Sequence, residues 1–350
     1  MNTKAGDWTY KLDQQWLELV TEDILEPEIP IIDPHHHLMS WPFDYEIDDW
    51  LAELKNSGHN VVATVHTEAH GHYRKEGPEH LKPVGETEYL VKSLEEANKP
   101  PDAPRVMAGI VGGGELQRGG TAVEELLDAH VAAANGRFRG VRINLFWGFD
   151  LDGRMFPAPN WEAAVDRAEL HDGVAQLARR NLCLELVCHH RNLPHVARLA
   201  RYVPGATIVV NHLGTIMDRN PNPEPEAELI TAWRKGIDTI ADRDNIRLKL
   251  GGCANPMISW SMPAMRAFYK RAKPPTSAEI AEVYRPFVTY AIEKLGPKRC
   301  MFESNFPVDK TMVSYPILWN AFKRLAHSYS PGERRALLGG TAADVYRLEL

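Results

Sequence analysis

Apolar and polar positions follow two regular patterns along the chain. Short runs of β-branched and other apolar residues predict buried strands, and most are followed by a stretch with apolar residues every three or four positions, which predicts an amphipathic helix. The predicted strands occupy residues 29–33, 61–66, 105–112, 138–144, 182–188, 207–212, 246–252 and 299–304. Helical patterns between them include residues 86–99, 121–135, 161–180, 193–203 and 277–295.

Eight strands that alternate with helices favour a closed (β/α)8 barrel, the TIM barrel of the α/β class. An open doubly wound sheet is the alternative, and it is disfavoured because no glycine-rich phosphate-binding turn follows the first strand. Residues 1–28 form an N-terminal extension, expected to pack against the barrel or a neighbouring subunit, so the barrel domain is expected over residues 29–350. A methionine-rich and aromatic insert after strand seven, residues 253–275, is expected to cover the pocket as a lid.

Composition narrows the class of protein. The 350 residues are 44% hydrophobic and 25% charged, as in ordinary globular proteins. The net charge is −7 with no basic stripe, which argues against a nucleic-acid partner. The N-terminus has no signal-peptide pattern, and the apolar runs are too short to span a bilayer, so we expect a cytoplasmic protein without a membrane partner. The four cysteines have no C-x-x-C spacing and lie in or beside apolar runs, which predicts reduced thiols in the core.

Three consecutive histidines follow the first predicted strand. Side chains alternate between the two faces of a strand, so Asp33, His35 and His37 are expected on one face and His36 on the other. Two imidazoles on one face can chelate a divalent metal ion through neutral nitrogens. The alternative is a pair of hydrogen-bonded structural histidines.

Polar residues also follow other predicted strands. They are His66, Glu68, His70 and His72 after strand two, His189 and His190 after strand five, His212 after strand six, and Glu303, Asn305 and Asp309 after strand eight. In a TIM barrel the C-terminal ends of the strands meet at one mouth, so this distribution predicts an active site there. Within the loop after strand two, Glu68 is the better candidate, and its three histidines are expected to be solvated.

Several of these motifs resemble a known family. D-x-H-x-H after strand one, the strand-five histidine, "HLG" after strand six and "ESNFP" after strand eight are similar to the amidohydrolase superfamily, in its amidohydrolase-2 branch. Further similarity runs through "YRKEGPEHLKPVGETE", "GRFRGVR", "LKLGG" and "RCMFESNFPVDK", across residues 30–348. The resemblance implies a TIM-barrel hydrolase in which His35 and His37 bind metal. It also matches His190, and less well its neighbour His189, to the strand-five histidine, and His212 to the strand-six histidine.

The chain departs from the family at strand eight, where Asn305 stands in place of the usual aspartate. An amide cannot accept a proton from water, and its carbonyl oxygen is a weak neutral ligand. The carboxylated lysine of two-metal relatives also has no counterpart in "RINLF" of strand four. The metal site is therefore expected to differ from that of its relatives.

Three mechanisms remain open. In the first, His35, His37 and His190, with or without Glu68, hold one Zn²⁺ or Mn²⁺, and Glu303 is the general base. In the second, the site is metal-free, as is thought for similar lactonases: histidines and arginines polarise a lactone carbonyl, and Arg142 binds the substrate carboxylate. In the third, the pocket decarboxylates its substrate, which Asn305 disfavours. Glu303 and Arg142 have structural alternatives, as an interior ion pair and a loop anchor.

The sequence therefore predicts a hydrolase that opens a lactone or similar cyclic carboxyl derivative of a small acidic metabolite. The alternatives are a metal-dependent carboxy-lyase acting on a small aromatic or muconate-type acid and a non-catalytic binding barrel, and a homodimer is expected. The candidate catalytic residues are Glu303, His212 and Asn305. The candidate substrate-binding residues are Arg142, Lys249, Glu68, His189 and Trp260.

Overall fold

The computed structural model describes residues 12–348 except 100–102, 145–146, 150–154, 158–160, 217–224, 255–266 and 269–270. Eight parallel strands form one sheet in the order in which they occur along the chain. They are β1 (Ile31–His36), β2 (Val61–Thr67), β3 (Arg105–Gly113), β4 (Phe138–Asn144), β7 (Cys183–Val187), β8 (Ile208–Val210), β9 (Ile246–Lys249) and β10 (Cys300–Met301). The strand pattern read from the sequence is thus confirmed.

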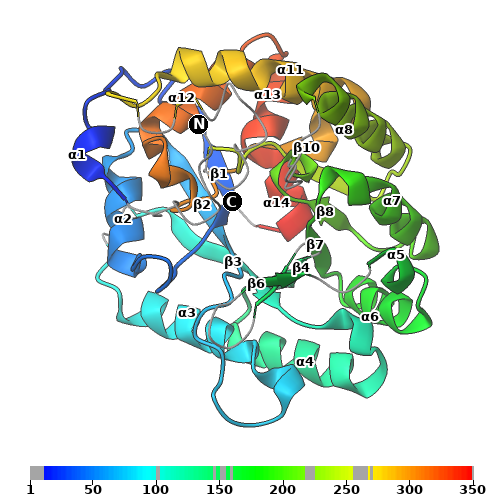
Figure 1. The fold of residues 1–350 in the computed structure, drawn as a ribbon. Helices are drawn as coiled ribbons and strands as arrows, with labels where there is room; N and C mark the ends of the chain where they lie inside the picture. The colour runs from blue at the N-terminus through cyan, green and yellow to red at the C-terminus, as the bar shows by residue number, and fades with distance from the viewer. Residues whose placement is uncertain are drawn as a thin grey trace.

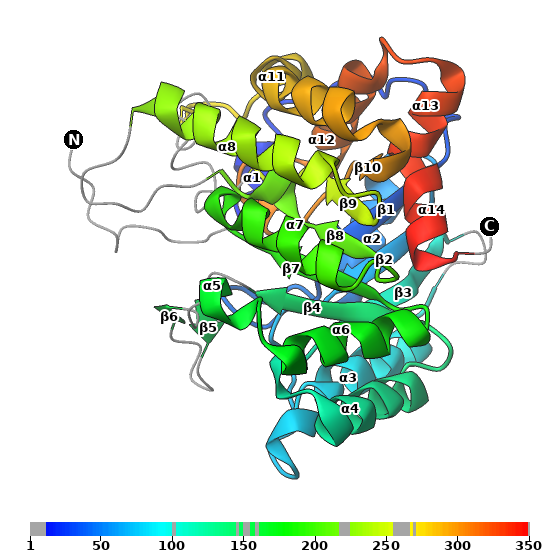
Figure 2. The same cartoon turned by 90° about the vertical axis from the view of Figure 1, so that its right-hand side faces the viewer.

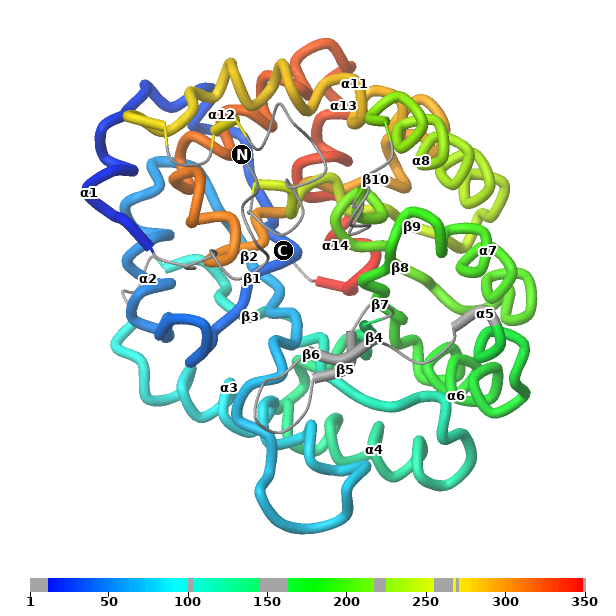
Figure 3. Tube along the Cα trace, viewed as in Figure 1, coloured from blue at the N-terminus to red at the C-terminus, as the bar shows by residue number. Residues whose placement is uncertain are grey.

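The sheet curves into a barrel with helices outside it (Figures 1 and 3). Just beyond β10, Phe306 bridges to His36 of β1, and the backbone amide of Asn305 donates to the carbonyl of His35 at 2.9 Å. These contacts join the last strand to the first. The TIM-barrel prediction is confirmed, because an open doubly wound sheet would reverse its strand order and leave both edges unpaired.

The helices follow the strands around the barrel. They are α1 (Gln14–Leu17), α2 (Ile47–Asn56), α3 (Val84–Glu96), α4 (Gly120–Ala133), α5 (Trp161–Ala164), α6 (Ala168–Arg179), α7 (Leu193–Tyr202), α8 (Glu226–Ala241), α11 (Ser277–Leu295), α12 (Tyr315–Ala326), α13 (Pro331–Arg335) and α14 (Thr341–Tyr346). Across the described residues, no helix combines the length and apolarity needed to cross a bilayer.

Two local features differ from the sequence prediction. The helix expected over 161–180 is divided into α5 and α6, because Arg167 adopts an extended conformation that ends one helix and begins the next. A short antiparallel hairpin, β5 (Trp147–Phe149) and β6 (Met155–Pro157), follows β4. Such three-residue strands are too short to give an alternating pattern in the sequence.

The core has two parts. A large cluster, which includes Trp50, Trp233 and Trp319, packs the strands against the surrounding helices. A smaller cluster includes Ile32 and Met301 of the strands together with Tyr346 of α14. Figure 2 shows α14 on the side of the barrel opposite the β5–β6 hairpin. All four cysteines are buried and free, as predicted.

The described part of the N-terminal extension packs against the barrel. The indole nitrogen of Trp16 donates to the carbonyl of Arg271 at 2.8 Å, and the amide of Leu25 donates to Asn320 Oδ1 of α12 at 2.9 Å. The buried ammonium of Lys323 donates to the carbonyls of Leu25 and Glu26, both at 2.8 Å. The division of the chain at residue 28 stays a prediction. The predicted lid also stays one, because most of its central residues lie outside the described part of the chain.

Candidate active site

His35 and His37 meet at the end of β1. Their Nε2 atoms lie 3.2 Å apart, and both rings are buried. The Nδ1 atom of His37 lies 2.6 Å from the carbonyl oxygen of Thr67, which can only accept, so Nδ1 carries the proton. Burial and the nearby charge of Arg142 lower the pKa of His37 to about 3, so the ring is neutral. The Nε2 atom of His37 therefore presents a lone pair to the site.

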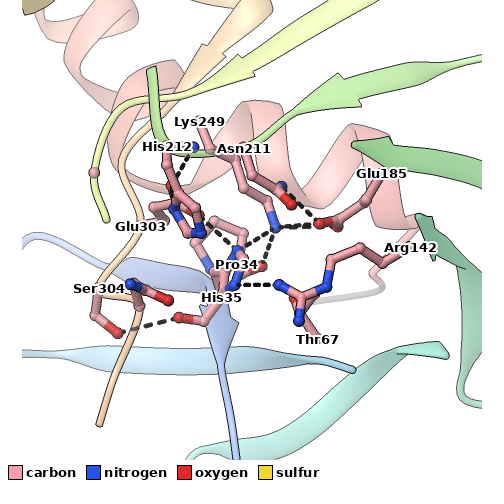
Figure 4. Close-up of polar contacts among 12 residues, drawn as sticks. Pro34, His35, Thr67, Arg142, Glu185, Asn211, His212, Lys249, Glu303 and Ser304 are labelled. Carbon is pink, nitrogen blue, oxygen red and sulfur yellow. Dashed lines mark hydrogen bonds and ion pairs between the residues drawn. The ribbon is translucent and has the colours of Figure 1, made fainter. Parts of the chain in front are cut away.

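The proton of His35 has two positions available. Its Nδ1 atom lies 2.7 Å from Glu303 Oε2 and 3.1 Å from Lys249 Nζ. Burial and the Lys249 charge hold the pKa of His35 well below its usual value, so the ring carries one proton. On Nδ1 this proton would face Glu303 Oε2, an atom that makes no hydrogen bond among the described residues. On Nε2 it is donated to His37, and Nδ1 then accepts from Lys249. Only the first arrangement leaves lone pairs on both Nε2 atoms. Figure 4 shows His35 at the centre of these contacts.

Asn305 places a third hydrogen-bond acceptor beside the Nε2 atom of His37. Its Oδ1 atom lies 3.2 Å from His37 Nε2, and its Nδ2 atom donates to Asp309 Oδ1 at 2.9 Å, which fixes the orientation of the amide. The amide oxygen and the imidazole nitrogen thus face each other with no proton between them. Acceptor atoms held this close are stabilised by a shared cation. The donor set of His35 Nε2, His37 Nε2 and Asn305 Oδ1 therefore fits a divalent metal ion, although it contains no carboxylate.

A second set of possible metal ligands overlaps the first. Donor atoms of His35, His212 and Glu303 all lie within 4.8 Å of one another. In this set, however, the Glu303 oxygens already lie against the Nδ1 atoms of both imidazoles. This is the arrangement in which a carboxylate orients histidines from behind. We therefore favour the first set as the metal site.

Glu303 holds His212 through two hydrogen bonds. Its Oε1 atom accepts from the backbone amide of His212 at 3.0 Å and from the Nδ1 atom of that ring at 2.8 Å. Burial alone would raise the pKa of Glu303, but the charge and hydrogen bonds of His212 and the charge of Lys249 together lower it, so the group stays ionised. A proton fixed on Nδ1 leaves the Nε2 atom of His212 able to accept one. His212 also retains 5% exposure, whereas Glu303 and His35 are fully buried.

Two glycines allow this close approach. A Cβ atom on Gly251 would lie 2.1 Å from the carbonyl oxygen of Glu303, and one on Gly252 would lie 1.8 Å from His212 Nδ1. Gly252 also has a φ of +68°, a left-handed conformation that favours glycine. His212 itself has a φ of +53° and begins a run of left-handed residues. Such backbone strain concentrates at functional sites.

Replacement of Gly252 by alanine should therefore remove activity while leaving the barrel folded. The new methyl group would displace the His212 ring, and a displacement of about 1 Å at a catalytic group can lower turnover by roughly 10²-fold. Gly205→Ala is the matched control, because a Cβ atom there meets nothing within 4 Å. Steady-state kinetics and circular dichroism of both variants provide the measurement. Wild-type turnover in Gly252→Ala would show that the position of His212 is unimportant.

Arg142 reaches the site from β4 and is anchored by Glu68. Its Nε atom donates to Glu68 Oε2 at 3.0 Å, and a second nitrogen contacts the Glu68 carbonyl oxygen. Glu68 also lies 2.7 Å from His70 Nδ1. Burial would raise the pKa of Glu68, but the charges of His70 and Arg142 outweigh this and lower it. The remaining Nη1 atom of Arg142 lies 3.5 Å from His35 Nε2, so one edge of the guanidinium faces the site.

Lys249 lies beneath His35, inside the barrel. Its ammonium donates to Glu185 at 2.8 and 3.0 Å and to the carbonyl oxygen of Pro34 at 2.9 Å, and all of these groups are shown in Figure 4. Glu185 also accepts from Asn211 at 2.8 Å and from Tyr346 of α14 at 2.5 Å. The ion pair that Lys249 forms is with Glu185, at 2.8 Å. A substrate-binding role for Lys249 stays a prediction.

Other histidines and Asp33 have different surroundings. Contrary to the prediction, Asp33 does not share a face with His35 and His37, since the strand register shifts between Asp33 and His36. Its carboxylate accepts from the backbone amide of Ser304 at 3.1 Å and from the hydroxyl of Tyr315 at 3.0 Å. His36 points away from the site, as predicted, and stacks on Trp50. His66 is buried rather than solvated, and its Nε2 atom accepts from the backbone amide of Leu38 at 3.0 Å.

The strand-five histidines lie just beyond β7. His190 is buried and its ring centroid lies 4.2 Å from that of His189, whose Nδ1 atom accepts from the backbone amide of Arg191 at 3.2 Å. The contacts described above join His35, His37 and His212, but they do not include His190, so its role as a ligand stays a prediction. Trp260 lies outside the described residues.

The sequence reading missed Glu185, Asn211 and Tyr346. A signal for Glu185 was present, since it is the one charged residue in the apolar run "LCLELVC". A carboxylate at such a position must be paired when the strand is buried. Tyr346 gave no such signal, because its helix lies at the far end of the chain.

Comparison with known proteins shows which sequences this chain is similar to. Residues 32–348 match the family model described as Amidohydrolase. The uncharacterized protein y4mH of Sinorhizobium fredii is 32% identical over 345 residues, which cover 92% of this chain and 99% of that protein. The L-fucono-1,5-lactonase of Burkholderia multivorans is 27% identical over 187 residues, which cover 53% of this chain and 58% of that enzyme.

Solved structures show the same fold. A crystal structure of an amidohydrolase from Burkholderia multivorans with bound zinc superposes with a TM-score of 0.65 at 23% identity, and it covers 91% of this chain and 99% of that one. Other structures of this fold carry the names of hydrolases or decarboxylases. The family resemblance read from the sequence is confirmed.

Proposed function

Because the chain belongs to the amidohydrolase family, we propose that it hydrolyses a small lactone and that His212 accepts the proton of the attacking water. Membership of the family supports an enzyme, either a hydrolase or a decarboxylase. The observation that carries the narrower proposal is the His212–Glu303 pair. It combines an oriented imidazole, which keeps 5% exposure, with a fully buried and ionised carboxylate behind it.

The proposed reaction needs one proton acceptor and returns the same proton. His212 Nε2 takes a proton from a water molecule as the water oxygen forms a bond to the lactone carbonyl carbon. When the ring carbon–oxygen bond breaks, the imidazolium donates that proton to the departing alkoxide. The product is a hydroxy acid, and Glu303 stabilises the transient positive charge on His212 throughout.

Arg142 would act on the carbonyl oxygen or on a carboxylate of the substrate. Its Nη1 atom points toward His35 while Glu68 holds the other edge of the guanidinium. A donor that is already oriented stabilises developing negative charge without the cost of reorganisation. We therefore propose an acidic or polyhydroxylated lactone as the substrate class.

The acceptor set of His35, His37 and Asn305 would hold the divalent ion that the family implies. When bound there, Zn²⁺ or Mn²⁺ would polarise a carbonyl group and lower the pKa of a bound water. The roles of His212, Glu303 and Arg142 do not depend on it. The lactonase among the relatives supports hydrolysis. Asn305 argues against the decarboxylase alternative, because the family resemblance implies an aspartate at this position in the decarboxylases.

A product assay tests the proposal. L-fucono-1,5-lactone and a carboxylated 2-pyrone serve as probes, and acid formation is followed by pH-stat alongside detection of CO₂. We expect ring-opened acid and no CO₂. Release of CO₂ from the carboxylated probe would instead support a carboxy-lyase. If neither acid nor CO₂ forms across a panel of related lactones, the hydrolase proposal is wrong, and the result supports a non-catalytic binding barrel.

Replacement of Asn305 by aspartate should increase retained metal. The carboxylate adds a negative charge beside His37, where the amide now offers only a neutral oxygen. We expect Asn305→Asp to retain more zinc than the wild type after dialysis, and His37→Ala to retain less, as measured by elemental analysis. Equal metal content in all three proteins would remove this acceptor set as the metal site.

A further inference from the structure

A cavity of about 340 Å³ lies at the foot of the barrel, between the beginnings of β3 and β4. Arg105 is the first residue of β3, and Arg139 is the second residue of β4. The strands are parallel, so their N-terminal ends lie on the face opposite the mouth that carries His35 and His212. In TIM barrels this face usually contributes to stability rather than catalysis. A cavity of this size there requires a different explanation.

The described lining of the cavity is positively charged. Lys99, Arg105, Arg137 and Arg139 line it, and no acidic side chain is among the described lining residues. Within the described part of the chain, none of these four cations forms an ion pair. Clustered cations without counter-charges repel one another, and a bound anion would remove that repulsion.

Arg139 is held in place with part of its guanidinium unused. Its Nη1 atom donates to the carbonyls of Gly136 at 2.8 Å and Phe138 at 2.9 Å. Its Nε atom is buried and has no hydrogen-bond partner among the described residues. Burial and the like charges of nearby arginines, first Arg347 and then Arg105, lower its pKa. Among the described residues, the Nε–H group of Arg139 therefore has no acceptor.

Apart from Asn135, the remaining lining is mostly apolar. Leu94, Val106 and Ala108 contribute apolar side chains, and Val106 and Ala108 are themselves largely buried in the core. The volume lies within the range of small-molecule sites, roughly 300–1,000 Å³. A bare inorganic anion would fill only part of this space, whereas an anion with an apolar or aromatic body would contact both the cations and the apolar wall.

We propose that this cavity binds a small organic anion that bears a phosphate group. Guanidinium groups bind phosphate oxygens in a paired geometry, and the cluster offers three guanidiniums within one cavity. Because the cations are confined to a hollow rather than spread in a stripe, a compact ligand fits better than a nucleic acid. This site is separate from the proposed lactonase site and does not depend on that function.

Calorimetric titration at low ionic strength tests the proposal, with adenosine 5′-monophosphate, inorganic phosphate and adenosine as probes. We expect the nucleotide to bind more tightly than either fragment. Arg105→Gln with Arg139→Gln should weaken nucleotide binding by at least about 10-fold. The matched pair Arg179→Gln with Arg201→Gln, on the exposed surface of α6 and α7, should leave it unchanged.

A variant of the catalytic mouth distinguishes the two anion sites. Arg142→Gln should bind the nucleotide as the wild type does, because Arg142 lies at the other end of β4. Loss of binding in Arg142→Gln but not in the Arg105/Arg139 variant would overturn the proposal. Absence of nucleotide binding to the wild type, or equal affinity for inorganic phosphate, would also overturn it.

Discussion

Replacement of His212 by asparagine is expected to lower the turnover of lactone hydrolysis by about 10²- to 10⁴-fold, the range of a lost general base. Asparagine retains an N–H group near the position of Nδ1, so the hydrogen bond to Glu303 can persist. What it removes is the Nε2 atom, which we propose as the proton acceptor. The variant therefore separates the chemistry of His212 from its contribution to the structure.

The measurement is steady-state kinetics on a hydrolysed lactone, together with thermal unfolding. His80→Asn is the matched control. His80 pairs with Glu125 at the surface and makes none of the contacts described for His35, His212 and Glu303. We expect the His212 variant to unfold near the wild-type temperature and the His80 variant to retain full turnover. If His212→Asn keeps turnover within about threefold of the wild type, another group must take the proton.

Replacement of Lys249 by methionine should produce the largest loss of stability. Lys249 and Glu185 are both fully buried, and their charged atoms lie 2.8 Å apart. Removal of one member leaves a buried charge without its partner, which typically costs about 3–5 kcal/mol in the free energy of unfolding. Denaturant titration measures that free energy. The exposed Lys92→Met variant, which removes a surface pair with Glu96, should show no measurable change.

The double variant Lys249→Met with Glu185→Leu provides the stricter test. Apolar side chains of similar volume often replace a buried ion pair without loss of stability. We therefore expect the double variant to have a free energy of unfolding much closer to that of the wild type than Lys249→Met has. A double variant that is as unstable as the sum of the two single variants would show that the two charges are not coupled.

The barrel could be predicted because burial imposes a repeated pattern. A strand enclosed by helices outside and other strands beside it must be apolar along most of its length, as in "TIVVNH" and "FRGVRIN". Eight such runs in alternation with helices leave few architectures. The β5–β6 hairpin escaped because it is short, and the break near Arg167 escaped because a local change in backbone conformation leaves the helical pattern intact on both sides.

The site was only partly predictable. His35, His37, His212 and Glu303 could be grouped because the ends of parallel strands converge, and their contacts confirm that they meet. The role of Glu303 as general base stays a prediction. Its oxygens lie against two imidazole Nδ1 atoms, a placement that the sequence did not indicate. Which atom faces which partner depends on rotamers and on the register shift after Asp33. Neither is encoded in the spacing of residues.

The hydrogen bond from Tyr346 to Glu185 links the last helix to the middle of the barrel. The residues of all eight strands are synthesised before this tyrosine is. Until then the interior carboxylate lacks one of its donors, and Phe306 has only just become available to close the ring with His36. Folding should therefore be completed late, and a chain truncated before Tyr346 should be degraded rather than merely less active.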